Sequence, residues 1–204
     1  MGPLVVGGFL VEEGRRAEVA LAGAKDSKLL SPAARERVYA ALAPIGERVS
    51  CSLSPREVDA AVRVGGLNRL EAETFARLIR QCAPSRAYVD ACDPVAPRFG
   101  RLVRALAGGS CVVVARHHAD RDEPIVGAAS IVAKVRRDAA LRELAGRVGV
   151  ELGSGYPSDA VTLAAVRAAL AGADRQAPWI RHSWKTAERL KPTTPPLRLE
   201  AFHS

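Results

Sequence analysis

Residues 86–99 read RAYVDACDPVAPRF, a short apolar segment with a carboxylate in its middle. Small, β-branched and aromatic side chains fit a pleated sheet, so residues 87–91 predict a buried strand bounded by Pro84 and Pro94. Asp90 interrupts this strand. Because an isolated charge is costly inside a buried strand, the Asp90 carboxylate must be paired, must bind a metal ion or must become protonated.

Two interpretations of Asp90 follow from this segment alone. It can be a metal ligand, because α/β folds place their ligands at the carboxyl ends of the strands. It can equally be a strand-end aspartate that caps a turn together with Asp93 and Pro94. The rest of the chain has to decide between them.

A second segment repeats the pattern. Residues 110–115 read SCVVVA and predict another strand, and Asp120 follows shortly after it. If the two strands are neighbours about 4.8 Å apart, Asp90 and Asp120 could share metal ions. Paired carboxylates suit Mg²⁺ or Mn²⁺, because hard cations prefer oxygen ligands, and this disfavours His117 and His118 as ligands.

Hydrophobic periodicity and capping residues predict alternating strands and helices in the rest of the chain. We expect a strand at residues 4–11 with residues 18–24 as its hairpin partner, and a further strand at residues 48–53. Helix starts are indicated by Ser31-Pro32, by a capping box at residues 54–57, by Asn68 and by Ser158. The expected helices cover residues 32–43, 55–64, 98–106 and 125–148, a segment from Asn68, a segment from Ser158 to about residue 170, and a short segment that starts within residues 181–186.

The helix that starts at Asn68 has a predicted core face of Ala72, Phe75, Ala76 and Ile79. Glu71 and Glu73 on the same helix are interpreted as cap and surface residues.

The composition indicates one substantial core and a polyanionic partner. The chain has 204 residues, 48% apolar content, a formal net charge of +8 and a pI near 9.9. The cysteines are widely spaced, which argues against a zinc site or a disulfide framework and predicts a reducing cytoplasmic setting; they are Cys51, Cys82, Cys92 and Cys111. We find neither a segment long enough to span a bilayer nor a signal peptide.

Two loops could contact a nucleic acid. Lys25 and Lys28 flank Ser27 and could hold a phosphate, although a solvated loop also explains them. Tyr156 lies in the glycine-bounded segment 153–159, where it could stack on a sugar or base or could cover the edge of the core.

Seven short motifs in this order resemble the type 2 ribonuclease H family (ribonuclease HII) in its archaeal form. The resemblance runs from residue 2 to about residue 190, and its motifs are KDSKLLS (25–31), LNRLEAE (67–73), VDACD (89–93), HAD (118–120), GAASIVAKVRRD (127–138), GSGYPSD (153–159) and SWKT (183–186).

This resemblance implies an RNase H-like α/β fold, a mixed sheet flanked by helices with a helical C-terminal part. It implies an endonuclease that cuts the RNA strand of RNA/DNA hybrids, and cuts 5′ to ribonucleotides embedded in duplex DNA, by two-metal-ion hydrolysis with Mg²⁺ or Mn²⁺ that leaves 5′-phosphate ends. Asp90 and Asp120 match two of the family's four metal-binding carboxylates. Tyr156 matches the tyrosine that packs on the sugar at the RNA-DNA junction, and Ser27, Lys28 and Lys134 fall in motifs that approach the nucleic-acid backbone.

One family motif is absent from this sequence. Family members begin with a central strand ending in Asp-Glu-Ala-Gly-Arg-Gly, which supplies the other two carboxylates and reads the ribose 2′-hydroxyl, whereas residues 1–6 here align just after it. We therefore expect an N-terminal truncation, most economically a start codon assigned too late. We also expect residues 4–11 and the Asp90 strand to lack their shared neighbour. The chain should bind metal weakly and cleave little, unless Asp122 or Glu123 substitutes as a ligand.

Other functional classes remain to be compared with the nuclease. The chain could be a hybrid-duplex binder without metal chemistry; a resolvase- or integrase-type nuclease is disfavoured by the tyrosine loop and the SWKT motif. Residues 197–202 resemble sliding-clamp docking peptides, although they lack the glutamine and the second aromatic residue. We expect a monomer with no membrane partner, a catalytic domain at residues 1–150, a helical part of the same unit at 151–190 and an extended tail at 191–204.

Overall fold

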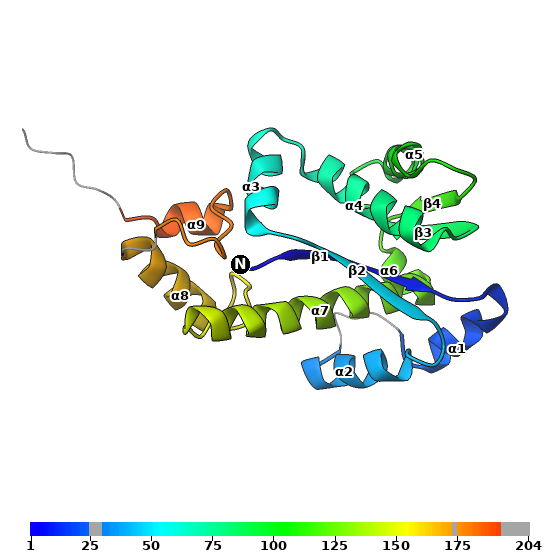
Figure 1. Ribbon diagram of the computed structural model, residues 1–204, viewed down its shortest axis with the longest axis horizontal. Helices are drawn as coiled ribbons and strands as arrows, with labels where there is room; N and C mark the ends of the chain where they lie inside the picture. Colours follow the sequence, from blue (N-terminus) through cyan, green and yellow to red (C-terminus); the bar gives the residue numbers. More distant parts are fainter. Residues whose placement is uncertain (25–29, 173–174, 193–204) are drawn as a thin grey trace, which may run out of the picture.

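The structure is a computed structural model, and it describes residues 1–24, 30–172 and 175–192. Strands and helices alternate along most of the chain, as Figure 1 shows. In chain order the elements are β1 (Leu4–Leu10), the 3-10 helix η1 (Glu13–Arg15), α1 (Arg16–Leu21), α2 (Pro32–Ala41), β2 (Glu47–Leu53), α3 (Pro55–Arg63), α4 (Leu67–Cys82), β3 (Arg86–Asp90), α5 (Ala96–Ala107), β4 (Val112–Arg116), α6 (Ala119–Asp122), α7 (Pro124–Val148), α8 (Ala160–Ala171) and α9 (Lys185–Leu190).

The strands form two separate pairs. β1 and β2 are antiparallel, with Leu4 opposite Leu53, and β3 and β4 are parallel, with Asp90 opposite Arg116. The predicted α/β fold with flanking helices is confirmed, but within the described residues the strands make two two-stranded sheets and no ladder joins β1 to β3. This agrees with the expectation that these two strands lack a shared neighbour.

Helices cover both strand pairs. The long helix α7 runs beneath β1, while α5 lies above β3 and β4 and α4 lies to their left in the view of Figure 1. The capping box predicted at Ser54 is present, because the Ser54 hydroxyl accepts from the Glu57 amide while the Glu57 carboxylate accepts from the Ser54 amide. The predicted core face of α4 is confirmed, with Ala72 and Ala76 fully buried.

The hairpin predicted for residues 18–24 is wrong. Residues 18–21 belong to α1, residues 22–24 follow the end of that helix, and the partner of β1 is β2. Alanine, leucine and charged residues with long side chains favour a helix there, and ion pairs at helical spacing, Arg15 with Glu18 and Arg16 with Glu13, stabilise it.

Two predicted caps also need correction. Gly66 precedes the first residue of α4, and Asn68 lies inside that helix, where its side-chain amide donates to Asp93 at 3.5 Å. Asp159, rather than Ser158, caps α8, because its carboxylate accepts from the Val161 amide at 3.0 Å. In both places a neighbouring residue reaches the cap position, which sequence spacing resolves only to within a residue or two.

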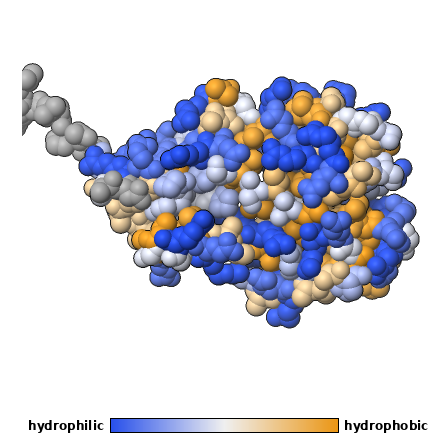
Figure 2. Space-filling model, viewed as in Figure 1, coloured by the Kyte–Doolittle hydropathy of each residue, from blue (hydrophilic) through white to orange (hydrophobic). Residues whose placement is uncertain are grey.

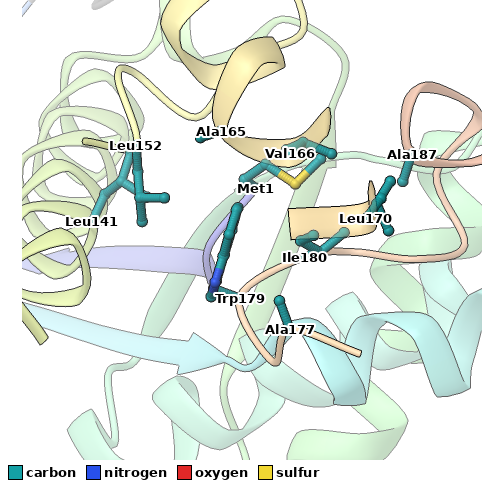
Figure 3. Packing of buried hydrophobic residues seen from close by; sticks show 10 residues of the cluster. All are labelled: Met1, Leu141, Leu152, Ala165, Val166, Leu170, Ala177, Trp179, Ile180 and Ala187. Atoms are coloured by element: carbon teal, nitrogen blue, oxygen red, sulfur yellow. The ribbon is translucent and has the colours of Figure 1, made fainter. Parts of the chain in front are cut away.

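A hydrophobic cluster joins the two ends of the described chain. Met1 packs with Leu141 of α7 and with Trp179 and Ile180 from the segment before α9, as Figure 3 shows. The chain beyond α7 therefore rests on the same core as the first strand. The boundaries expected at residues 150 and 190 stay predictions.

The contact between β1 and α7 leaves no room for a side chain at Gly7. A Cβ atom at this position would lie close against the backbone of Ala129 and Ala133. We expect Gly7→Ala to lower the free energy of unfolding by about 2 kcal/mol, because the two backbones cannot move apart without loss of packing. Denaturant unfolding measures this loss. Gly14→Ala is the matched control, since nothing lies within 4 Å of its Cβ position, and an equal loss in both variants would contradict the packing argument.

In the described part of the chain, no helix combines the length and apolarity that a membrane crossing requires.

Candidate active site

Asp90 is the last residue of β3, and its carboxylate is held by the segment that follows β4 in the chain. Its Oδ1 accepts a hydrogen bond from the Ala119 amide at 3.1 Å, which ties the end of β3 to the start of α6. The Ala91 amide continues the ladder by donating to the Arg116 carbonyl at 2.9 Å. The turn after β3 is capped by Asp93, whose Oδ1 accepts from the Val95 amide at 2.8 Å, whereas Asp90 bonds to a distant segment and lines a cavity. Its role as a metal ligand stays a prediction.

Asp120 reaches the same place by a sharp turn. β4 ends at Arg116, and His118 adopts the left-handed conformation with φ of 56°, so that the chain turns into α6 directly after the strand. Asp120 is 4% exposed and lines the same cavities as Asp90. The prediction that β3 and β4 are neighbours is confirmed. The shared metal site stays a prediction.

Few other ligating side chains lie around this pair. Among residues 1–24, 30–172 and 175–192, no three His, Cys, Asp or Glu side chains group in a way that could hold a metal ion. The Glu123 carboxylate, considered above as a substitute ligand, accepts from Arg16 at 2.9 Å, and His117 Nε2 lies 3.3 Å from the Pro94 carbonyl oxygen. Asp122 is exposed.

A cavity of about 510 Å³ separates the two strand pairs. β1 and β3 both line it along their full length, and helices α4 and α7 supply apolar side chains such as Phe75 and Ala133. Among the described strands, each of these two pairs on one side only. Apolar residues are visible in Figure 2 over the region where β1, β3 and β4 lie in Figure 1. Asp90 and Asp120 stand at one end of this cavity.

Glu71 on α4 also faces this cavity, although its sequence position indicated cap and surface. Burial raises the pKa of Glu71, while a hydrogen bond with the Cys92 thiol lowers it. No motif spacing marked this residue, because its proximity to Asp90 arises only when α4 packs beside β3.

A second cavity of about 320 Å³ opens on the other side of the two aspartates. The nucleic-acid-contacting residues expected from the sequence meet here in part: Tyr156 and Lys134 both line this cavity, whereas Ser27 and Lys28 lie outside the described residues. The charged and aromatic side chains of its lining are Asp90, Asp120, Lys134, Arg137, Tyr156, Arg181 and Trp184.

Tyr156 lies on a loop that is held by hydrogen bonds between residues of the loop and α8. The Thr162 hydroxyl donates to the Leu152 carbonyl at 2.8 Å and accepts from the Gly155 amide at 2.9 Å. Tyr156 is 44% exposed, and the Arg137 guanidinium carbon lies 4.2 Å from the centre of its ring. The ring is therefore presented to the solvent beside the cavity rather than covering the core.

Asp159 links this loop to α8. Hydrogen bonds from the Ser154 amide, and weaker contributions from Val161 and Thr162, lower the pKa of Asp159 to about 2. A carboxylate with a depressed pKa in the folded state stabilises the loop above its unfolded pKa near 3.8, and this contribution is lost as the pH falls through about 2.

We therefore expect the loop around Tyr156 to keep its structure down to about pH 3 and to loosen near pH 2, and Asp159→Ala to loosen it at neutral pH. The carboxyl ¹³C resonance of Asp159 and the Ser154 amide resonance, followed by NMR, report both events. A carboxyl titration midpoint near 4 would contradict the role of these hydrogen bonds.

Sequence motifs did not single out Arg181, which is 3% exposed and lines the second cavity. Its Nε donates to the Gly2 carbonyl at 3.0 Å, and its guanidinium carbon lies 4.3 Å from the centre of the Trp184 ring. Burial and the nearby charge of Arg137 lower the pKa of Arg181 to about 10, although Asp59, Tyr156 and Glu71 act in the opposite direction.

The segment that carries Arg181 is anchored by a buried carboxylate on α3. Asp59 accepts from the His182 amide at 2.8 Å, from the Ser183 amide at 2.9 Å and from the Ser183 hydroxyl at 2.6 Å. Burial raises the pKa of Asp59, but these hydrogen bonds outweigh it and the net shift is downward. The SWKT segment thus owes its position to a residue more than a hundred positions earlier.

The comparisons with known proteins point to a single family. The sequence model of the family described as ribonuclease HII matches residues 1–187. Among curated proteins, ribonuclease HII of Methanocella arvoryzae is 42% identical over 188 residues, which are 92% of this chain and 84% of that protein. Ribonuclease HII of Methanoregula boonei is 40% identical over 190 residues, 93% of this chain and 88% of that protein.

Solved structures agree with this fold. The Archaeoglobus fulgidus protein in a PCNA:RNase HII complex matches with a TM-score of 0.83 and 33% identity, over 95% of this chain and 92% of that chain. Ribonuclease H2 from Pyrococcus horikoshii matches with a TM-score of 0.81 and 35% identity, over 94% of this chain and 90% of that chain.

Proposed function

This chain belongs to the ribonuclease HII family and is a ribonuclease H endonuclease, and from that premise we propose that it cuts the RNA strand of RNA/DNA hybrids and cuts 5′ to ribonucleotides embedded in duplex DNA. The observation that carries the proposal is the meeting of Asp90 and Asp120 at the edge of two parallel strands. Both face a cavity that Tyr156 and Lys134 also line.

Asp90 and Asp120 fit a divalent cation such as Mg²⁺ or Mn²⁺. Both supply carboxylate oxygens, which hard cations prefer. Asp120 is almost fully buried, and a buried carboxylate is stabilised by a positive charge beside it. A pair of such ions, when bound, supplies activation of the attacking water and stabilisation of the leaving 3′-oxygen.

The other side chains of the second cavity bind and orient the nucleic acid. The exposed ring of Tyr156 packs against the sugar next to the scissile phosphate, and Arg137 behind the ring restricts its orientation. Lys134 on α7 lines the same cavity as Tyr156 and the two aspartates, where its ammonium group attracts the phosphate backbone.

A second candidate function is duplex binding with little cleavage. Of the four carboxylates that the family resemblance implies, the described residues supply Asp90 and Asp120, and no third ligating side chain completes a group around them. The family resemblance implies a central strand that supplies the other two, and the cavity between β1 and β3 would offer such a strand a place. We propose that the chain binds metal weakly for this reason.

One experiment separates these two functions. The purified chain is incubated with Mn²⁺ and a labelled DNA duplex that contains one ribonucleotide, and cleavage and gel retardation are read together. A cut 5′ to the ribonucleotide supports the nuclease, and retardation without cleavage supports the binder. The same duplex without the ribonucleotide is the control. Equal cleavage and equal retardation of the two duplexes would contradict both functions.

A fusion tests the reason for weak activity. When a strand ending in Asp-Glu-Ala-Gly-Arg-Gly is placed before Met1, we expect Mn²⁺ affinity and cleavage to rise by about 100-fold or more, because added carboxylates complete the ligand set. A fusion with Asn-Gln in place of Asp-Glu is the matched control. Equal Mn²⁺ affinity and equal rates for the chain and both fusions would contradict the proposal.

Docking to a sliding clamp is a further part of this proposal. The Archaeoglobus fulgidus relative was solved in a complex with PCNA, and residues 197–202 of this chain, which lie outside the described residues, resemble clamp-docking peptides. Deletion of residues 193–204 should abolish clamp affinity in a pull-down or calorimetric titration. Unchanged affinity would end this idea.

A further inference from the structure

Arg181 is a buried guanidinium whose outer nitrogens have no partner in the described part of the chain. Its Nε donates a hydrogen bond to the Gly2 carbonyl, and its guanidinium group lies over the Trp184 ring. No ion pair and no acceptor for Nη1 or Nη2 is present among the described residues, although the side chain is 3% exposed. A buried charge without a carboxylate partner is costly, which favours a site built for an anion from outside.

A second guanidinium lies close by and reinforces the positive charge. The charge of Arg137 lowers the pKa of Arg181, and both residues line the second cavity. Arg137 is held by the Ser154 carbonyl at 3.1 Å and by the Tyr156 ring. Two like charges that are held together without a bridging carboxylate attract a common anion.

Arg137 contacts the Asp138 carboxylate at 3.4 Å, but no carboxylate of the described residues forms an ion pair with Arg181. Asp59 is occupied by the His182 and Ser183 hydrogen bonds, and both Asp59 and Glu71 act on Arg181 through their charge without a hydrogen bond to it. Asp90 and Asp120 line the same cavity. The lining therefore carries two aspartates, Asp90 and Asp120, together with two arginines, Arg137 and Arg181.

We propose that Arg181, together with Arg137, binds one phosphate of the nucleic-acid backbone in the second cavity and thereby sets the position of the strand relative to Asp90 and Asp120. This inference rests on the proposed function, and it adds a phosphate contact through Arg181, which lies outside the sequence motifs. Trp184 and the Gly2 carbonyl hold the guanidinium in place, so that Nη1 and Nη2 form the fork that a phosphate accepts bidentately.

Modified substrates test this contact in the unaltered protein. Duplexes with a single ribonucleotide and one neutral methylphosphonate linkage, moved stepwise along each strand, are titrated by fluorescence anisotropy with Ca²⁺ in place of Mg²⁺ or Mn²⁺. We expect one linkage near the ribonucleotide at which loss of the charge weakens binding about tenfold or more, because a bidentate phosphate contact is lost.

The protein variants then assign the phosphate to Arg181. Arg181→Met should weaken binding of the unmodified duplex by the same factor, should lose its sensitivity to that one linkage, and should lower the slope of log K against log salt by about 0.9. Arg181→Lys keeps the charge and should restore part of the affinity. Arg189→Met, an exposed position on α9 with the same loss of charge, should keep the sensitivity.

The proposal is overturned if the affinity losses from Arg181→Met and from each methylphosphonate linkage simply add. It is also overturned if no linkage weakens binding, or if the protein does not bind the duplex. If Arg181→Met fails to fold, sensitivity of Arg181→Lys to the linkage decides: reduced sensitivity supports the contact, and unchanged sensitivity overturns it. Cleavage of the ribonucleotide duplex without such coupling would leave the proposed function standing and remove only this inference. If the Arg181 variants lose their sensitivity to that linkage while the chain shows neither cleavage nor a preference for the ribonucleotide, the phosphate contact stands and the proposed nuclease function falls.

Discussion

Asp90→Asn is expected to weaken Mn²⁺ binding by about 100-fold or more and to remove whatever metal-dependent cleavage the chain has. The loss of one anionic oxygen from a site with so few carboxylates removes much of its attraction for a divalent cation. The fold should persist, because an asparagine Oδ1 can still accept the hydrogen bond from the Ala119 amide. Mn²⁺ titration by electron paramagnetic resonance measures binding directly, whatever the rate of cleavage.

The control for this variant is Asp122→Asn. Asp122 lies on the same short helix as Asp120 but is exposed, and it was one of the residues considered as a substitute ligand. We expect its Mn²⁺ affinity to equal that of the parent chain. Equal losses in Asp90→Asn and Asp122→Asn would show a diffuse acidic surface rather than a site, and no loss in Asp90→Asn would remove Asp90 from the metal centre.

Asp59→Ala is expected to lower the free energy of unfolding by about 4 kcal/mol. It leaves the His182 amide, the Ser183 amide and the Ser183 hydroxyl without their acceptor in a largely buried place. Because these bonds hold the segment that carries Arg181, duplex binding should weaken as well. Asp59→Asn should lose less, since one amide oxygen can still serve Ser183.

Chemical denaturation and duplex titration of the same preparations measure both effects. Arg56→Ala is the control on α3, because Arg56 is exposed and a surface change there should alter stability by less than about 0.5 kcal/mol. A loss of stability in Asp59→Ala with unchanged duplex affinity would show that Asp59 supports the fold but not the position of Arg181.

Local sequence signals predicted most of the elements that position the candidate site. The capping box at Ser54 and the Ser31-Pro32 pair at the start of α2 act within one helical turn, so they can be read without knowledge of the rest of the chain. The apolar runs before Asp90 and Asp120 likewise predicted two strands that each end near a carboxylate. The hairpin at residues 18–24 failed, because a segment that is apolar at some positions and charged at others fits either state until its partners are known.

The sequence by itself determined that Asp90 and Asp120 follow strand-forming segments, since that depends on neighbours along the chain. Only the tertiary structure decided what surrounds them. Arg181 is placed by a carbonyl 179 residues away, and Ser183 by a carboxylate 124 residues away. Such contacts leave no local pattern, because burial and hydrogen bonding between distant segments are established only when the helices and strands pack together.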